Sequence, residues 1–361
     1  MRKMTRQTEC RGVRIGGGAP VSVQSMTNTD THDVAATLGQ IKRLEEAGCD
    51  IVRIAVSDQA AAEAFGEIRK KTDMPLVADI QFDYRMAVAS AEQGADAVRI
   101  NPGNIGSRER VKAVVDECRA RRIPVRVGVN SGSVEKDILA KYGGVTPRGL
   151  AESAMRNVKL LEDLDFGDIV ISAKASDVRK NFETYRILSQ MTDYPLHIGV
   201  TESGDRMRGA VKSAAGLGAL LLEGIGDTMR VSLTGDPVDE IPVAREILKC
   251  TGNLDSGINL VSCPTCSRCK TDLTQITSKV MEAIESREPA LIKSGRRMLT
   301  AAVMGCAVNG PGEAKGADLG AACGDGKAVI FSGGRIIKTV PEEQIAEALT
   351  AELDRIIEEG V

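Results

Sequence analysis

The sequence predicts an α/β protein in which a TIM (β/α)8 barrel is followed by a small α+β domain. One short β-branched apolar run and one longer segment of helical periodicity alternate from residue 20 to residue 250. This alternation stops after Cys250, and most of the nine cysteines follow residue 260. A length of 361 residues accommodates roughly two domains, and a barrel of this class fills about 250 residues. We therefore place the barrel at residues 1–252 and the second domain at residues 253–361.

Eight apolar runs are predicted as the strands of the barrel. Strands that alternate with helices pair in parallel through right-handed crossovers, and eight such units favour a closed barrel over an open sheet. No G-x-G-x-x-G motif follows the first run, which argues against an open dinucleotide-binding sheet. The runs are 21–26, 50–56, 75–80, 97–102, 124–129, 168–173, 195–200 and 228–233.

Eight segments between and after these runs are predicted as helices. Several begin with Asp or Ser, which accept hydrogen bonds from the first backbone N–H groups, or carry Pro in the first turn. The segments are 33–47, 58–71, 83–93, 107–121, 147–164, 176–191, 206–222 and 237–250.

The second domain is predicted from the segments that follow a polar linker at 251–259. A strand leads into Cys263, a helix covers 272–285, and a second strand covers 298–304 before a Gly- and Pro-rich loop. Short strands at 328–331 and 335–340 precede a final helix at 341–359. This order indicates an α+β domain of about 100 residues.

Composition excludes several classes of function. The net charge is −3 with both signs interspersed, so no polybasic surface indicates nucleic acid or anionic membrane as a partner. The apolar run 214–225 is too short to span a bilayer, and the polar first 14 residues lack the apolar core of a signal peptide. We therefore expect a soluble, cytoplasmic protein.

Charged and polar side chains gather at the carboxyl ends of the predicted strands, which we call the barrel mouth. Active sites of this barrel class lie there. Burying four Arg and one Lys is costly without an anion, and Asp79 and Glu202 are the acidic partners in view. The excess predicts an anionic ligand such as diphosphate, whose oxygens match guanidinium groups bidentately. The mouth residues are Arg53, Asp79, Arg99, Asn101, Arg126, Asn130, Lys174, His197, Thr201, Glu202, Arg230 and Ser232.

Other roles remain open for individual mouth residues. Any one Arg also fits an internal salt bridge or an outward orientation toward a helix. His197 fits a hydrogen-bonded core histidine as well as a site residue, and Glu202 fits a solvated loop carboxylate as well as a general acid or base.

The second domain carries a C-x-x-C-x-x-C motif at residues 263–269, and a further cysteine, Cys306, follows later in the sequence. Cys10, Cys49, Cys118 and Cys250 are scattered and are expected to be ordinary thiols. Spacing alone predicts a metal site made of Cys263, Cys266, Cys269 and Cys306, and both zinc and an iron–sulfur cluster accept such ligands. Glu313 follows in a Gly-rich loop, and an exchangeable carboxylate on one iron indicates a catalytic rather than a purely electron-transferring cluster.

Seven segments in order resemble the 4-hydroxy-3-methylbut-2-enyl diphosphate synthase family of the methylerythritol phosphate isoprenoid pathway, in its two-domain bacterial form. They are VQSMTNT at 23–29, VADI at 77–80, RINPGNIG at 99–106, KASD at 174–177, EGIGDT at 223–228, CPTCSR at 263–268, and GC at 305–306 continuing to NGPGEA at 309–314.

The resemblance implies a sulfite-reductase-like [4Fe-4S] domain and a head-to-tail homodimer in which the cluster domain of one chain caps the barrel mouth of the other. It places cluster ligands on Cys263, Cys266, Cys306 and Glu313, which leaves Cys269 outside the ligand set. It places diphosphate-binding groups on Arg53, Arg99, Arg126, Lys174, Arg230 and Ser232, with Asn101, Asn130, His197, Thr201 and Glu202 lining the site.

The expected activity is the reductive ring opening and dehydration of 2-C-methyl-D-erythritol 2,4-cyclodiphosphate, with electrons from flavodoxin or ferredoxin and a proton from Glu202. Two other readings remain: a redox-inert barrel transferase with structural zinc, and a non-catalytic iron–sulfur electron carrier. The chain departs from the family pattern at Gln81, where the family usually has His, and in the extra thiols of Cys269 and Cys323.

Overall fold

A computed structural model describes residues 2–269, 271–306, 314, 316–324 and 326–359. The chain divides into two compact units, Met1–Leu254 and Asp255–Val361. Each unit has a hydrophobic core of its own.

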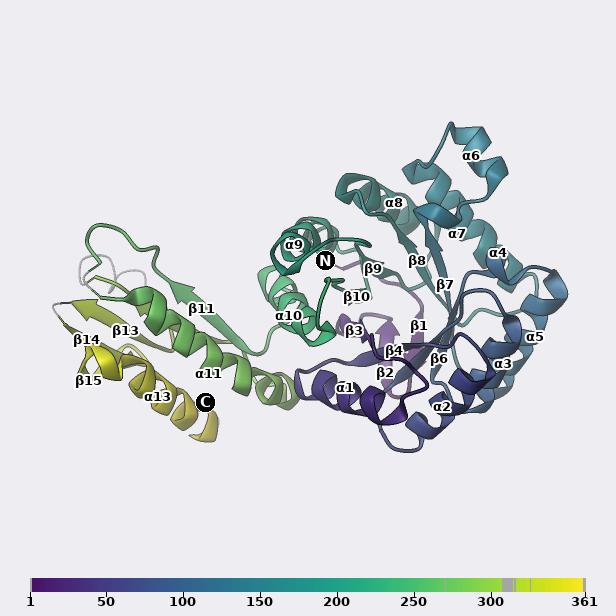
Figure 1. Cartoon of the computed structure of the whole chain (residues 1–361). Helices are drawn as coiled ribbons and strands as arrows, with labels where there is room; N and C mark the ends of the chain where they lie inside the picture. Colours follow the sequence, from purple (N-terminus) through teal and green to yellow (C-terminus); the bar gives the residue numbers. More distant parts are fainter. Residues whose placement is uncertain (1, 270, 307–313, 315, 325, 360–361) are drawn as a thin grey trace. The chain divides into compact units, whose positions relative to one another are not determined.

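The first unit is a nearly closed barrel of parallel strands surrounded by helices (Figure 1). The strands follow one another in the order β8-β7-β6-β5-β4-β3-β10-β9, and a parallel bridge from Ile171 to Leu196 brings β8 to β9. All eight predicted strands are confirmed: β3 (Ser22–Met26), β4 (Ile51–Ala55), β5 (Leu76–Asp79), β6 (Ala97–Ile100), β7 (Val125–Asn130), β8 (Ile169–Lys174), β9 (His197–Gly199) and β10 (Thr228–Arg230).

The predicted helices also form, and their starts follow the capping residues. Asp33, Asp58, Asp177 and Asp205 each accept a hydrogen bond from a backbone N–H group in the first turn of the helix that follows. The helices are α1 (Val34–Glu46), α2 (Gln59–Arg69), α3 (Tyr84–Glu92), α5 (Arg108–Arg121), α7 (Pro147–Glu162), α8 (Val178–Met191), α9 (Arg206–Leu222) and α10 (Glu240–Cys250), the last preceded by the 3-10 turn η2 (Pro237–Asp239).

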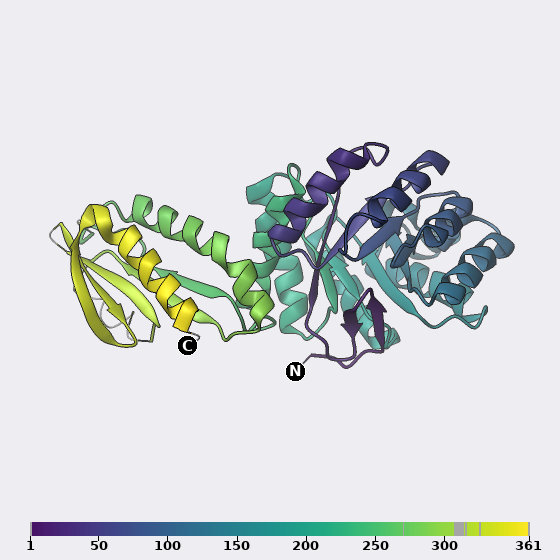
Figure 2. The same cartoon turned by 90° about the horizontal axis from the view of Figure 1, so that it is seen from below.

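The sequence did not predict an antiparallel hairpin at the other end of the barrel, β1 (Gln7–Cys10) with β2 (Val13–Gly16) (Figure 2). Cys10 and Ile15 of this hairpin pack with Ile51 and Val77, which lie near the amino ends of their strands. The hairpin therefore closes the end opposite the mouth. Further short helices that were not predicted are α4 (Pro102–Ile105) and α6 (Lys136–Tyr142), with the 3-10 turn η1 (Ser131–Ser133).

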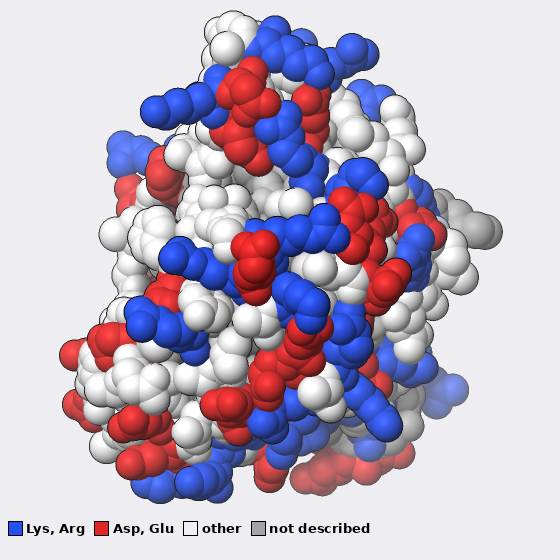
Figure 3. Space-filling view, turned by 90° about the vertical axis from the view of Figure 1, so that its right-hand side faces the viewer, with Lys and Arg blue, Asp and Glu red and all other residues white. Residues whose placement is uncertain are grey.

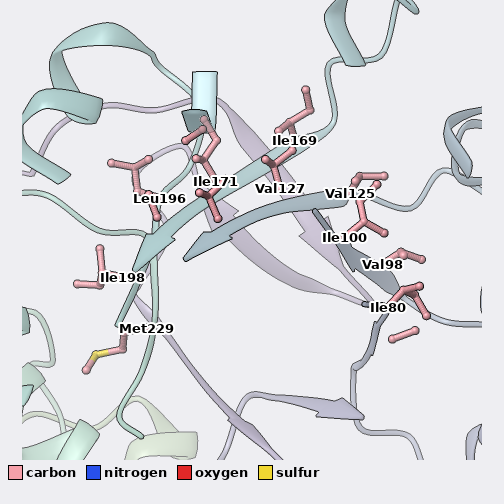
Figure 4. Packing of buried hydrophobic residues seen from close by; sticks show 14 of the residues in the cluster. Ile80, Val98, Ile100, Val125, Val127, Ile169, Ile171, Leu196, Ile198 and Met229 are labelled. Atoms are coloured by element: carbon pink, nitrogen blue, oxygen red, sulfur yellow. The ribbon is translucent and has the colours of Figure 1, made fainter. Parts of the chain in front are cut away.

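The main core lies between the strands and the helices. Figure 4 shows side chains such as Val98, Ile100, Val125 and Val127 packed on this outer face of the barrel. Successive strand residues point to opposite faces, so the residue between two core residues points into the barrel. This alternation positions the site.

The second unit is a five-stranded sheet with two long helices. Its strand order is β11-β12-β13-β14-β15, with parallel pairing from β11 to β13 and antiparallel pairing beyond. The elements are β11 (Ile258–Ser262), α11 (Leu273–Ser294), β12 (Leu299–Met304), β13 (Leu319–Gly324), β14 (Lys327–Ser332), β15 (Arg335–Pro341), η3 (Glu342–Gln344) and α13 (Ile345–Glu359). β13 was not predicted, and the first helix was predicted to end at residue 285, whereas α11 continues through Pro289 to Ser294.

The outer surface carries both signs of charge, which are intermixed on the face shown in Figure 3. On α5, Lys112 pairs with Asp116 and Arg121 pairs with Glu117, one helical turn apart. Within the described ranges, no helix is long and apolar enough to cross a membrane.

Candidate active site and metal-binding loops

Strand alternation turns the predicted cations into the barrel. Arg53 lies between core residues Val52 and Ile54, and Arg126 lies between Val125 and Val127. The same parity applies to Arg99, Lys174, His197 and Arg230. An outward orientation toward the helices is therefore excluded for these side chains.

Asp79 is the acidic centre of one side of the mouth. Its carboxylate accepts a hydrogen bond from Nη1 of Arg99 at 3.0 Å, and Nε of Arg53 lies 3.6 Å from its second oxygen. Burial opposes the charged carboxylate, but Arg53, Arg99 and Arg126 together outweigh burial and hold the pKa of Asp79 below its ordinary value. Burial, reinforced by repulsion from Arg230 and Arg99, lowers the pKa of Arg53 to about 10 despite the attraction of Asp79.

Arg230 is held on the other side by Glu240 of α10. Its Nε and Nη2 donate to the two Glu240 oxygens at 3.0 and 2.9 Å, and Ser25 Oγ donates to the same carboxylate at 2.7 Å. The expectation that Glu202 would be the second acidic partner is wrong, because Glu202 is exposed and Glu240 takes that position. Sequence reading of strand ends alone could not find a carboxylate that a helix supplies.

Arg126 is the least compensated cation of the mouth. It is 5 % exposed, and its Nη1 donates to Oε1 of Gln24 at 2.6 Å. Its Nε and Nη2 are buried and have no hydrogen-bond partner among the residues that the structure places. Burial, with repulsion from Arg53 and Arg99, holds the pKa of Arg126 well below its ordinary value. Two unpaired buried N–H groups on one guanidinium are suited to an anion with two adjacent oxygens.

Lys174 and His197 form a second uncompensated pair. Nζ of Lys174 lies 3.2 Å from Nε2 of His197, and Nδ1 of His197 lies 3.4 Å from the Thr228 hydroxyl. Burial and the nearby Arg side chains lower the pKa values of both groups well below their ordinary values. His197 is therefore neutral near pH 7. Its contact with Lys174 places it within the mouth.

Two glycines make room for these side chains. A Cβ atom on Gly128 would lie 2.2 Å from Nε of Arg99, and one on Gly199 would lie 2.5 Å from Nζ of Lys174. The cations thus lie across neighbouring strands where another residue would have a side chain.

The remaining predicted residues lie at the same ends of the strands but outside this network of ion pairs. The Asn101 side chain accepts from the Gly103 N–H and caps α4. Asn130 and Glu202 are exposed, and Glu202 has a left-handed φ of 54°. Thr201 and Ser232 are half-buried, and Gln81 is exposed.

The cysteine loops of the second unit meet at one edge of its sheet. Cys263 directly follows β11, and its backbone N–H donates to Val303 of β12 at 3.1 Å. Cys306 lies two residues after β12, the parallel neighbour of β11. Carboxyl ends of adjacent parallel strands lie side by side, so the fold itself brings together two segments of the motif that are distant in sequence.

The electrostatics of this edge favour the thiolate of Cys266. Hydrogen bonds from the backbone and side chain of Arg268 lower the pKa of Cys266. The Arg268 pKa is raised, first by its hydrogen bond to Cys266 and also by the charges of Cys306 and Cys263. The Arg268 guanidinium therefore interacts electrostatically with three cysteine sulfurs. The thiolate is the form in which cysteine binds metal.

This donor set fits an iron–sulfur cluster chemically. All nine cysteines are described, and no disulfide joins any of them. Within the residues that have been placed, no three Cys, His, Asp or Glu side chains converge closely enough to hold a metal ion. Glu313, predicted as the fourth ligand, lies outside the described residues.

Residues of the mouth that sequence reasoning missed are Gln24, Glu240, Gly128 and Gly199. Gln24 carried a signal, since it alternates with apolar Val23 in the first strand run. The two glycines carried none, because their role depends on side chains from neighbouring strands.

Comparison with known proteins was consistent over both units. A sequence-family model described as the GcpE TIM-barrel domain matches residues 5–245, and a second family model, described as the GcpE protein C-terminal domain, matches residues 259–355. Relatives named 4-hydroxy-3-methylbut-2-en-1-yl diphosphate synthase (flavodoxin) include that of Caldanaerobacter subterraneus, 54% identical, and that of Geobacter sulfurreducens, 52% identical, each over 99% of both chains. The relative of the same name from Clostridium perfringens is 56% identical over 99% of both chains.

Proposed function

This chain belongs to the GcpE family of 4-hydroxy-3-methylbut-2-en-1-yl diphosphate synthases, and we propose that its barrel mouth binds the diphosphate group of the cyclic substrate. The chain is an oxidoreductase that forms 4-hydroxy-3-methylbut-2-enyl diphosphate from 2-C-methyl-D-erythritol 2,4-cyclodiphosphate in isoprenoid precursor biosynthesis. A zinc-containing transferase and a simple electron carrier are not favoured, since relatives matched over nearly the whole chain bear this one enzyme name.

The observation that carries the proposal is the uncompensated charge inside the mouth. Among the described residues, the carboxylates that form ion pairs with Arg53, Arg99, Arg126, Lys174 and Arg230 are those of Asp79 and Glu240. A diphosphate would supply the missing negative charge and accept from the two unpaired N–H groups of Arg126. Residues of the rim proposed to line the same site are Asn101, Asn130, His197, Thr201, Glu202 and Ser232.

These residues act on the reaction by holding the leaving group. When the ring opens, the carbon–oxygen bond to one phosphate breaks and negative charge grows on the diphosphate. Fixed guanidinium groups in a water-poor site stabilise that charge without reorganising, and they keep the product fragment in place. Glu202, exposed at the rim after β9, is the proposed proton donor to the departing hydroxyl.

The family is one of iron–sulfur enzymes, and we propose a [4Fe-4S] cluster held by Cys263, Cys266, Cys306 and Glu313. When bound, such a cluster supplies electrons one at a time at low potential. Flavodoxin, which the names of the relatives include, is the proposed electron donor, with ferredoxin as the other candidate. We further propose the head-to-tail homodimer, in which the second domain of one chain serves the barrel of its partner.

The proposed function is tested with anaerobically reconstituted protein, a low-potential reductant and the cyclodiphosphate. Formation of hydroxymethylbutenyl diphosphate is expected, and its absence from protein that carries an intact cluster would overturn the assignment. Mössbauer spectra should show one iron without a thiolate ligand. Cys269→Ser should keep the cluster and Cys306→Ser should lose it, and the reverse result would exclude the proposed ligand set.

A further inference from the structure

We propose that Cys269 and Cys323 are a redox-active thiol pair, which a small disulfide such as oxidised glutathione converts to an intramolecular disulfide. The pair lies beside the metal-binding loops but includes none of the proposed ligands. The inference rests on the proposed ligand set, which places Cys269 outside the cluster ligands. Its test reads disulfide formation rather than catalysis, so it can fail while the proposed activity stands.

The first observation is the position of the Cys269 sulfur over Gly305. A Cβ atom built on Gly305 would lie 2.7 Å from Sγ of Cys269. The sulfur therefore occupies the space that a side chain at position 305 would fill. Cys269 also packs against the core of the second unit, together with Leu260 and Cys263.

The second observation is the register of β12 and β13. Met304 is opposite Ala322 in this parallel pair, so the next row brings Gly305 beside Cys323. Neighbours in one row of a sheet point to the same face, and the two strands are about 4.8 Å apart. Val303 and Cys323 both belong to the core on that face, which confirms the side on which Cys323 points. The two sulfurs are thus brought to adjacent places on one face.

Thr271 links the two thiols directly. Its hydroxyl lies 3.8 Å from Sγ of Cys269, and its backbone carbonyl accepts from the same sulfur at 3.3 Å. The Thr271 side chain also hydrogen-bonds to Cys323, and the charge of Cys269 acts on Cys323. A single threonine in contact with both thiols is independent support for their proximity.

The two thiols differ in access, which sets the order of the reaction. Cys269 is half-buried, whereas Cys323 is 0 % exposed. The Cys269 thiolate attacks oxidised glutathione, forms a mixed disulfide and releases one glutathione thiol. Cys323 then attacks the Cys269 sulfur and releases the second glutathione thiol, so that two protein thiols are oxidised and one glutathione disulfide is reduced.

Burial governs the rate of the second step. It raises the pKa of Cys323 to about 11; the hydrogen bond from Thr271 opposes this rise, and the charges of Cys269, Glu342 and Cys263 add to it. Because the thiolate is the attacking species, closure should accelerate as the pH increases toward that value. The product disulfide would tether the segment that carries Cys263 and Cys266 to β13.

The test uses the anaerobic holoenzyme, treated with oxidised glutathione at pH 8.5, blocked with iodoacetamide and mapped by mass spectrometry after proteolysis. We expect a Cys269–Cys323 cross-link. The internal controls are Cys250, which is exposed and should stop at the mixed disulfide, and buried Cys118, which should be alkylated only after unfolding.

Two variants make the test specific. In Cys323→Ala, Cys269 should retain its glutathione adduct because no thiol displaces it. In Gly305→Ala, both thiols remain but the new Cβ displaces the Cys269 sulfur, so the cross-link should be lost. Persistence of the mixed disulfide in the unaltered chain, or an unchanged cross-link in Gly305→Ala, would overturn the proposal. If Gly305→Ala does not fold, the test is the comparison of the unaltered chain with Cys323→Ala. A stable glutathione adduct on Cys269 in both proteins would overturn the proposal.

Discussion

At the scale of single residues, the mouth is built from charges that destabilise the protein in the absence of a ligand. Arg126 is the sharpest case, with two buried N–H groups that have no partner among the described residues. Desolvation of an uncompensated cation opposes folding. The proposed diphosphate would supply the partner that these N–H groups lack.

We expect Arg126→Met to separate binding from stability. Losing charge-assisted hydrogen bonds of about 1.5–3 kcal/mol should lower kcat/KM by about 10- to 100-fold. Removing the buried cation should at the same time raise the free energy of unfolding, by about 1–4 kcal/mol. Steady-state kinetics and chemical denaturation of the same preparation check both changes.

Arg69→Met is the matched control. The Arg69 guanidinium is also buried, but it donates to Asp96 and to the Met74 carbonyl, both at 2.7 Å. Its removal takes the closest cation away from the half-buried Asp96 carboxylate, which keeps the Leu76 N–H and the more distant Arg11. This loss should cost about 1–3 kcal/mol of stability, with kcat/KM retained. If Arg126→Met behaved like Arg69→Met, the anion-binding role of Arg126 would be refuted.

Lys174 and His197 predict a protonation change on ligand binding. Both pKa values are depressed in the free mouth, first by burial and then by neighbouring cations. A bound anion favours the protonated forms and raises both values, so binding near pH 7 should take up protons. Folding of the ligand-free chain has the opposite linkage to protons, because it releases protons whereas ligand binding takes them up. The unfolded chain binds more protons, so the free energy of unfolding falls as the pH drops through the ordinary His value of about 6.5.

Calorimetry with inorganic diphosphate measures this uptake. Titrations at pH 7 in buffers of different ionisation enthalpy give the number of protons exchanged. The unaltered protein should take up more protons than Lys174→Met. Protons exchanged by diphosphate itself contribute to both titrations, so the difference between the two proteins removes them. Equal values for the two proteins would contradict the linkage.

At the scale of elements, the barrel strands place functional side chains by alternation, and glycines on neighbouring strands give those side chains room. Gly128→Ala should force Arg99 away from Asp79, because the added Cβ would lie 2.2 Å from Nε of Arg99. We expect a higher KM with the fold retained, measured by kinetics and far-UV circular dichroism.

Gly132→Ala, in the 3-10 turn that directly follows β7, is the control. A Cβ at Gly132 meets no described atom within 4 Å, so this variant should keep the KM of the unaltered protein. Equal KM values for the two variants would show that the clearance at Gly128 is unimportant for binding.

At the scale of the whole molecule, the chain has two hydrophobic cores with separate memberships. Units of this kind can unfold in separate transitions. Removing a cluster held by Cys263, Cys266 and Cys306 should destabilise only residues 255–361, because metal binding contributes folding free energy to the unit that holds the metal.

Scanning calorimetry of the holo and apo proteins tests this expectation. Cluster removal should lower one transition and leave the barrel transition unchanged, and hydrogen exchange should place the loosened amides after residue 254. A single transition that shifts as a whole would show that the two units unfold together.

The sequence by itself determined the order of the barrel, because hydrophobic periodicity and helix caps are local signals. It did not reveal β13, whose Gly- and Ala-rich segment LGAACG lacks the β-branched residues that mark strands. Nor did it reveal the β1–β2 hairpin. This hairpin packs on the amino ends of several strands, and those ends come together only in the folded barrel.

The candidate site divides in the same way. Strand-end position in the sequence identified the cations, since alternation along a strand is fixed by the backbone. Only the tertiary structure decided their partners: Glu240 comes from a helix, Gln24 from the strand across the barrel, and the clearance at Gly128 depends on Arg99 of the next strand. Which charges are compensated and which remain for a ligand is settled by contacts between distant segments, and no local pattern encodes those contacts.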